Sequence, residues 1–233
     1  MSEAHTALLV RVAATIVALH PERIVRIAID GVDGAGKTTL ADALAPVVAA
    51  QGRPTIRASV DDFHRPRIFR YARGRHSPDG HYLDSYDYDS FRTRLLDPLS
   101  PGGSGRYLAR SFDLDNDRPF DPDWKQAKPA AALIVDGIFL QRPGLRSYWD
   151  LSLYLRVDFE VSLPRGAQRD AAPGSSDPGA PLNQRYVGGQ IRYFDACTPE
   201  QQADIVIDYN DLQAPKVLKW RPPDADRAKR NPK

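Results

Sequence analysis

The most constraining feature of this chain is a glycine-rich segment between a strand-like run and a helix-like run, "IAIDGVDGAGKTTLADAL", at 27–44. It matches the spacing G-x-x-x-x-G-K-[ST], in which glycines let backbone N–H groups converge on phosphate oxygens. The following helix adds its positive dipole end, the lysine reaches the β- and γ-phosphates, and the hydroxyl is a ligand for Mg²⁺. A glycine turn without a ligand is the alternative, but both flanking elements fit a phosphate-binding loop. We expect a nucleoside triphosphate to be bound by Gly31, Asp33, Gly34, Ala35, Gly36, Lys37, Thr38 and Thr39.

Strand-like and helix-like runs continue to alternate along the chain. Short apolar runs predict strands at 24–29, 55–60, 131–135, 151–157 and 205–207, and helical spacing predicts helices at 1–20 and 39–50. This order indicates an α/β protein with a mainly parallel sheet covered by helices on both faces, as in P-loop NTPases. We expect one domain at 1–220, irregular segments at 98–128 and 171–183, and a polar tail at 221–233.

Composition excludes several classes of protein. The 233 residues carry a net charge of only +2, which gives no general argument for nucleic-acid binding. Cys197 is the only cysteine, so an internal disulfide is excluded. The longest apolar stretch, at 7–19, is interrupted by Arg11 and is too short to span a membrane. We expect a cytoplasmic protein without nucleic-acid or membrane partners. The sequence does not indicate the oligomeric state.

The γ-phosphate has several fates in proteins with such a loop, namely hydrolysis, switching or transfer to a second substrate. The chain has no Asn-Lys-x-Asp segment to read guanine, and one small domain is unlike a motor or transporter ATPase. A small-molecule kinase is favoured. Such an enzyme needs an acid near the acceptor hydroxyl, an acid that organises the metal ion, and arginines over the transferred group.

Two acidic segments fit these requirements. "SVDDFHRP" places Asp61 and Asp62 after the predicted second strand, and "LIVDG" places Asp136 after another. Carboxyl ends of parallel strands line the binding crevice of such sheets. Neighbouring side chains of an extended segment point opposite ways, so we expect only one of Asp61 and Asp62 to face the phosphates. A turn residue for Asp61 and a helix cap for Asp136 are the alternatives.

Basic residues supply the third requirement. "VSLPRGAQRD" carries Arg165 and Arg169 four residues apart, so a helix would present both on one face, where they could clamp phosphates. A solvated helix face is the alternative. The glycine- and proline-rich segment that follows indicates a lid hinge, and we assign the lid to 163–195.

Together, "GVDGAGKTT", "DDFHRP", "DSYDYDSF", "LIVDGIF", "RGAQRD" and "ADIVI" resemble the uridine kinase/phosphoribulokinase family of P-loop kinases, over about 24–208. The resemblance implies a nucleoside-monophosphate-kinase-like fold with a five-stranded parallel core and a lid. It also implies ATP and Mg²⁺ as cofactors and phosphorylation of a small-molecule hydroxyl acceptor.

Carried over by position, the resemblance implies roles for individual residues. Asp61 would be the base and a metal contact, with Thr38 and the Walker B acid Asp136 as the other metal ligands. Lys37, Arg165 and Arg169 would act on the phosphates. The "ADIVI" stretch, with Ala203 and Asp204, would lie near the adenine pocket. The acceptor would meet Asp61, His64, Asp84, Phe112 and Arg185.

The chain departs from the family at two places. The segment "SFDLDNDRP" lacks the histidine that helps uridine kinases read the base, and 171–184 contains no lid arginine, so Arg185 is the substitute. Both departures bear on the acceptor more than on kinase chemistry. The first expectation is the 5′-hydroxyl of uridine or cytidine. The alternatives are pantothenate, ribulose phosphate or another nucleoside, and an ATP-binding regulator without transferase activity.

An arginine-rich loop follows the second predicted strand. Two interpretations stay open: the loop binds an anionic acceptor, or it is only a solvated loop. Its arginines are Arg65, Arg67, Arg70, Arg73 and Arg75.

Overall fold

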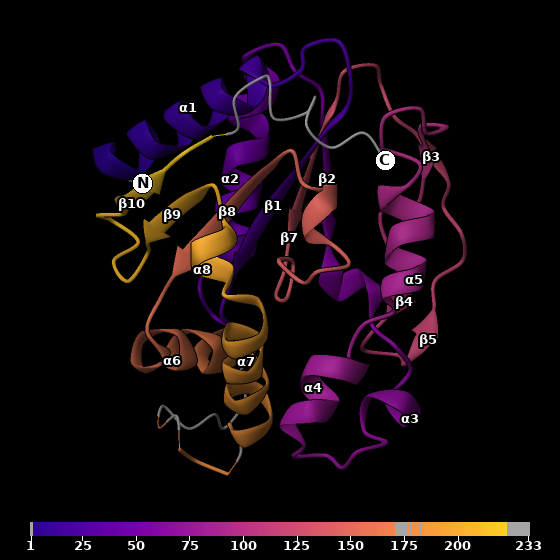
Figure 1. Cartoon of the computed structure of the whole chain (residues 1–233), viewed down its shortest axis with the longest axis vertical. Coiled ribbons are helices and arrows are strands. Elements are labelled where there is room, and N and C mark those ends of the chain that lie inside the picture. Colours follow the sequence, from indigo (N-terminus) through magenta and orange to yellow (C-terminus); the bar gives the residue numbers. More distant parts are fainter. Residues whose placement is uncertain (1, 171–176, 178, 182, 223–233) are drawn as a thin grey trace.

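The computed structural model describes residues 2–170, 177, 179–181 and 183–222, with the backbone alone described at 169 and 170. Figure 1 shows a central sheet with α1 and α2 on one side and α5 on the other. Helices α3, α4, α6 and α7 lie beyond one end of the strands, at the bottom of the view. Residues 223–233 of the tail predicted at 221–233, and most of the segment at 171–183, lie outside the described residues.

In the described part of the chain the central sheet has the order β10-β9-β8-β1-β7-β2. Neighbouring strands from β9 to β2 pair in parallel, which confirms the predicted five-stranded parallel core, and β10 pairs antiparallel with β9 at the edge. The sequence did not predict β10, whose residues are mostly exposed. The strands are β1 Val25–Gly31, β2 Thr55–Ser59, β7 Ala132–Asp136, β8 Leu151–Arg156, β9 Ile205–Asp208 and β10 Lys216–Trp220.

Helices and short turns of helix connect these strands. The α-helices are α1 Glu3–Ala18, α2 Lys37–Ala50, α3 Arg67–Arg70, α4 Pro78–Asp84, α5 Tyr88–Phe91, α6 Phe159–Asp170, α7 Gln184–Cys197 and α8 Pro199–Gln202. Tighter or wider turns are η1 Val60–Phe63, η2 Arg92–Leu96 and η3 Arg146–Tyr148. The segment predicted as irregular at 98–128 contains two-residue strands that form two small hairpin sheets, β3 Arg106–Tyr107 with β6 Lys125–Gln126 and β4 Phe112–Asp113 with β5 Arg118–Pro119.

Alternate side chains of the strands divide the core into two layers. On β1, Ile27 and Ile29 pack with α1 and α2, whereas Ala28 faces the layer of η1, α5 and η2. Leu133 of the neighbouring β7 lies in the second layer with Ala28. Burial on both faces explains why the central strands are continuous apolar runs. This supports the predicted three-layer arrangement.

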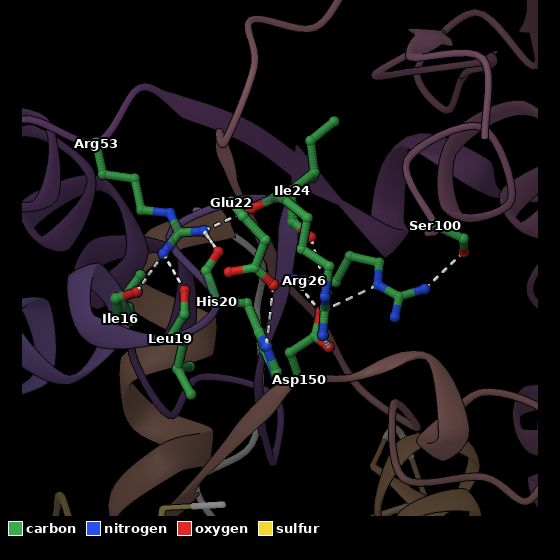
Figure 2. Close-up of polar contacts among 10 residues, drawn as sticks. Ile16, Leu19, His20, Glu22, Ile24, Arg26, Arg53, Ser100 and Asp150 are labelled. Carbon is green, nitrogen blue, oxygen red and sulfur yellow. Dashed lines mark hydrogen bonds and ion pairs between the residues drawn. The ribbon is translucent and has the colours of Figure 1, made fainter. Parts of the chain in front are cut away.

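The end of α1 is fixed by one buried arginine, shown in Figure 2. Arg53 is 4% exposed, and its guanidinium donates hydrogen bonds to the carbonyl oxygens of Ile16 at 2.8 Å and Arg23 at 2.8 Å, and to that of Leu19. The last carbonyls of a helix have no partner within the helix, so this arginine caps α1. Burial lowers the pKa of Arg53.

Ion pairs to one buried carboxylate join the starts of two central strands. Arg26 of β1 donates from Nε to Asp150 Oδ2 at 3.2 Å, and Arg23 donates to Asp150 Oδ1 at 2.8 Å (Figure 2). Burial opposes ionisation of Asp150, but these two arginines outweigh it and hold its pKa below the usual range. These contacts fix the register of β1 against β8 at the end of the strands opposite the phosphate-binding loop.

No helix within the described residues is long and apolar enough to cross a membrane.

Candidate active site

The glycine-rich loop joins β1 to α2, as predicted, and it packs closely on two other elements. A Cβ atom at Gly31 would lie 2.7 Å from the carbonyl oxygen of Leu155 in β8. At Gly34, where φ is +74°, it would lie 2.1 Å from the carbonyl oxygen of Ser162 in α6. Distances this short are not sterically accessible, so glycine is required where the loop touches β8 and α6.

Lys37 and Thr38 open α2 and point into the loop and toward β7. Lys37 Nζ donates to the Val32 carbonyl at 2.7 Å, across the curve of the loop. Thr38 Oγ1 donates to Asp136 Oδ2 at 2.6 Å. Asp136 is the last residue of β7 and is 1% exposed. Two of the three residues proposed from sequence as metal ligands, Thr38 and Asp136, are therefore in direct contact, although they are separated by 98 positions.

The second oxygen of Asp136 has a partner that the sequence did not suggest. Arg57 of β2 donates from Nη2 to Asp136 Oδ1 at 2.7 Å, and Ser59 donates from Oγ to the Asp136 carbonyl at 3.2 Å. Carboxylate and hydroxyl oxygens are the donors that Mg²⁺ prefers, so Thr38 and Asp136 fit this ion. Within the described residues, no group of three or more His, Cys, Asp or Glu side chains forms a metal cluster.

Asp61 lies on η1, directly after β2, at the same edge of the sheet as Asp136. Ser59 pairs in register with Asp136, which places both strand ends level. Asp61 is exposed, and its Oδ1 accepts a hydrogen bond from the Tyr86 hydroxyl at 2.8 Å. His64 contacts the Asp61 carbonyl through Nδ1 at 2.7 Å and packs on the Tyr86 ring, with 4.5 Å between centroids.

Asp62 lies in a more buried environment than Asp61. Burial and then the charge of Asp61 raise the pKa of Asp62 to about 6, with Arg110 opposing and Asp136 adding to the effect. The backbone carbonyl of Asp62 accepts from the Ser111 amide at 2.9 Å. The sequence predicted an extended segment in which only one of these carboxylates faces the phosphates. The structure instead has the η1 turn here, with Asp61 exposed and Asp62 more buried.

Asp33, in the loop, is held by α7, most of which lies within the region predicted as the lid. Its amide donates to Gln190 Oε1 at 2.8 Å, and Gln190 Nε2 donates to Asp33 Oδ2 at 3.4 Å. His81 Nε2 of α4 lies 3.8 Å from the same Oδ2 atom. The side chain of Asp33 is therefore directed toward α4 and α7.

Asp30, just before the loop, is fully buried. Its carboxylate accepts from the Gly31 amide at 2.8 Å, from the Gln141 amide at 3.3 Å and from the Tyr193 hydroxyl of α7. Burial raises the pKa of Asp30 to about 6, against these hydrogen bonds and the charge of Lys37. Because Tyr193 and Gln190 lie three residues apart, one edge of α7 contacts the loop twice.

The two predicted lid arginines whose side chains the structure describes, Arg165 and Arg185, bind backbone carbonyls of different segments. Arg165 of α6 donates to the backbone carbonyls of Tyr209, at 3.1 Å, and Asn210, just beyond β9. The side chain of Arg169 lies outside the described residues. Arg185 is buried and donates to the carbonyls of Arg70 at 2.9 Å and Ser77 at 3.3 Å, so it joins α7 to the arginine-rich loop.

The other acceptor residues proposed from sequence lie in different places. Asp84, at the end of α4, forms ion pairs with Arg73 at 2.8 Å and Arg65 at 3.7 Å. Phe112 is buried in the small β4–β5 hairpin. Asp204 was expected near an adenine pocket, but it binds the Ser152 amide at 2.9 Å before β9 begins. That expectation was wrong, because this is the opposite end of the sheet from the loop.

Sequence reasoning did not assign six further residues to the site, and all of them except Asp30 reach it from other segments of the chain. They are Asp30, Arg57, His81, Tyr86, Gln190 and Tyr193. Of these, Asp30 had a local signal, since it directly precedes the loop, and Tyr86 lies in a motif already noted. The others carry no motif of their own.

Comparison with known proteins agrees with this geometry. The model of the phosphoribulokinase/uridine kinase family matches residues 26–208. No curated protein sequence matches the chain.

Several solved structures share the fold. A possible uridine kinase from Bacillus stearothermophilus is 21% identical with a TM-score of 0.68, and the match covers 86% of this chain and 97% of that one. A D-glycerate 3-kinase from Cryptococcus neoformans is 10% identical with a TM-score of 0.59, covering 91% and 99%. The phosphoribulokinase from Rhodobacter spheroides is 14% identical with a TM-score of 0.54, covering 87% and 77%.

Proposed function

The chain belongs to the phosphoribulokinase/uridine kinase family, and on that basis we propose that it transfers the γ-phosphoryl group of ATP to a hydroxyl group of a small molecule. The observation that carries the proposal is the contact of Thr38 Oγ1 with Asp136 Oδ2 at 2.6 Å, beside a phosphate-binding loop. Asp61 lies at the same sheet edge, where an acceptor hydroxyl would meet the phosphates.

The chain's own residues would divide the work as follows. The loop amides and the start of α2 bind phosphate oxygens, and Lys37 exchanges the Val32 carbonyl for the β- and γ-phosphates. Thr38 and Asp136 would hold Mg²⁺, with Asp61 nearby, and the ion would neutralise charge on the phosphates. Asp61 accepts the proton of the acceptor hydroxyl while Tyr86 keeps its carboxylate oriented.

For the acceptor we propose the 5′-hydroxyl of uridine or cytidine. A possible uridine kinase is among the structures of this fold. The neutral charge of a nucleoside also fits the site, because three of the five arginines in the arginine-rich loop are already engaged in ion pairs. Arg65 and Arg73 pair with Asp84, and Arg70 pairs with Asp117 at 3.1 Å.

An anionic acceptor is the second candidate, and the exposure of Arg67 and Arg75 in the same loop favours it. One structure of this fold is named as a D-glycerate 3-kinase, whose acceptor carries a carboxylate. On this alternative, those two arginines would bind the anionic group.

The test is ADP release from Mg²⁺-ATP with a panel of acceptors: uridine, cytidine, other nucleosides, pantothenate, ribulose 5-phosphate and D-glycerate. Stimulation by uridine or cytidine is expected, and Asp61→Asn should abolish it while ATP binding persists. Stimulation by D-glycerate or ribulose 5-phosphate alone would favour the anionic acceptor. ATP binding without stimulation by any acceptor would favour a regulator that lacks transferase activity.

A further inference from the structure

The side chain of Asp33 lies where the phosphate-binding loop meets the acceptor side of the site. Its carboxylate is 38% exposed and faces α4 and α7, the helices that border the arginine-rich loop. The backbone amide of Asp33 donates a hydrogen bond to Gln190 Oε1 at 2.8 Å, so this N–H is directed to α7. The motif alone assigns Asp33 to ATP, but its side chain is directed to His81 of α4 and Gln190 of α7.

His81 gives an independent reason to regard this junction as a binding site. The residue is 5% exposed, and its Nδ1 contacts the Ser85 hydroxyl at 3.2 Å. Among the described residues, its Nε2 atom has no hydrogen-bond partner and lies 3.8 Å from Asp33 Oδ2. Buried ring nitrogens normally have a partner, so an unsatisfied one directed at a carboxylate requires an explanation.

The packing around His81 fixes the direction of its ring. Phe139 and Tyr186 contact it edge-on at 5.3 Å and 5.0 Å between centroids. A Cβ atom at Gly189 of α7 would lie 2.7 Å from the His81 ring, so this glycine allows α7 to approach α4. His81 Nε2 and Gln190 Nε2 consequently meet at one oxygen of Asp33, at 3.8 Å and 3.4 Å.

Asp33 also acts on the tyrosine that orients the proposed base. Burial, then Asp61, then Asp33 raise the pKa of Tyr86 well above its usual value. The Tyr86 hydroxyl binds Asp61 at 2.8 Å. Asp61 thus binds the Tyr86 hydroxyl directly, whereas Asp33 acts on it through its charge.

We propose that Asp33 is an acceptor-binding residue, whose carboxylate accepts a hydrogen bond from a second hydroxyl group of the acceptor, other than the one that is phosphorylated. His81 and Gln190 are positioning residues that hold this carboxylate toward the acceptor. The inference rests on the proposed kinase function and deepens it. It commits the acceptor to a molecule with at least two hydroxyl groups, one that is phosphorylated and one that binds Asp33.

The experiment compares Asp33→Asn with wild type in acceptor-dependent ADP release and in binding of Mg²⁺-ADP. Asn keeps the size of the side chain but loses the charge and one acceptor oxygen. Loss of a hydrogen bond to a charged group corresponds to about tenfold or more in affinity. We expect the KM of the stimulating acceptor to rise about tenfold, with the Kd of Mg²⁺-ADP within about twofold of wild type. Asp195→Asn, on the exposed side of α7, is the matched control.

Positioning is tested at His81. His81→Phe should raise the acceptor KM, whereas His81→Gln, which keeps a donor near Asp33, should restore it toward wild type. Thermal unfolding of each variant identifies any that fail to fold. If Asp33→Asn fails to fold, the His81 pair decides, and equal KM values for His81→Phe and His81→Gln would overturn the proposal.

The remaining outcomes are distinct from one another. A wild-type protein that no acceptor stimulates would refute the proposed function itself. A stimulated wild type with an unchanged acceptor KM in Asp33→Asn would refute only the role of Asp33. Weakened Mg²⁺-ADP binding, alone or together with a raised acceptor KM, would make Asp33 a residue of the nucleotide loop and would also overturn the proposal.

Discussion

The contact of the phosphate-binding loop with α6 makes Gly34→Ala the sharpest probe of the site. Gly34 has φ of +74°, and an added Cβ atom would lie 2.1 Å from the Ser162 carbonyl oxygen and 3.1 Å from the Gly166 amide nitrogen. Since both neighbours are backbone atoms of one helix, no side-chain rotation can relieve the clash. Either the loop or α6 must move.

Two terms set the expected loss of stability. The left-handed conformation costs an alanine about 1–2 kcal/mol. Overpacking a well-packed contact adds about 1–3 kcal/mol. Gly52→Ala isolates the first term, because Gly52 has φ of +93° and no atom within 4 Å of the added Cβ. We expect Gly34→Ala to destabilise by about 2–5 kcal/mol and Gly52→Ala by about 1–2 kcal/mol.

Urea denaturation measures both free energies of unfolding, and titration with Mg²⁺-ADP measures the effect on the loop. Gly34→Ala should weaken Mg²⁺-ADP at least about tenfold, because the shift displaces phosphate-binding amides, whereas Gly52→Ala should leave it unchanged. Equal destabilisation by the two substitutions, with equal Mg²⁺-ADP affinity, would refute the argument that α6 fixes the loop.

Further predictions concern one side chain each. Arg53→Met should destabilise by about 3 kcal/mol in urea denaturation, because it removes the donor for buried carbonyls at the end of α1; a loss below about 1 kcal/mol would contradict that capping role. Asp30 has a pKa of about 6, above the usual value of about 3.9, so its ionised form destabilises the fold above pH 6 and this penalty disappears as the pH falls toward 4. The stability of wild type minus that of Asp30→Asn should therefore rise by about 3 kcal/mol between pH 7 and pH 4, and a flat difference would refute the assignment. Tyr86→Phe should lower kcat about tenfold through the loss of its 2.8 Å hydrogen bond to Asp61, with Mg²⁺-ADP affinity retained as the control.

Local patterns were sufficient to predict the frame of the fold. The strand, glycine turn and helix around Gly31 are specified by contiguous residues, and β7 by an apolar run that ends in Asp136. β10 was missed because its residues 216–220 have no apolar pattern and pair only with β9. A strand that depends on a neighbour's edge cannot be read from its own composition.

The site was predictable to the extent that its residues lie at strand ends. Asp61, Thr38 and Asp136 fall at one sheet edge, as the parallel topology requires. Arg165 was expected over the phosphates because of helical spacing, yet it binds carbonyls beyond β9. Spacing gives the face of a helix but not what that face meets, so contacts between distant segments remained outside the sequence prediction.

Helix α7 shows why those distant contacts matter. Its residues Gln190 and Tyr193 bind Asp33 and Asp30 at the phosphate-binding loop. Arg185, earlier in the helix, donates to carbonyls next to α4. One rigid element is thus bonded both to the loop that would hold ATP and to the segment beside the proposed acceptor. Because helix geometry fixes the spacing of these contacts, a displacement of α7 at one end must alter hydrogen bonds at the other. The distance between the phosphate-binding loop and the segment beside α4 is therefore set by a helix with no recognisable motif, which explains why the glycine-rich loop alone says little about the acceptor.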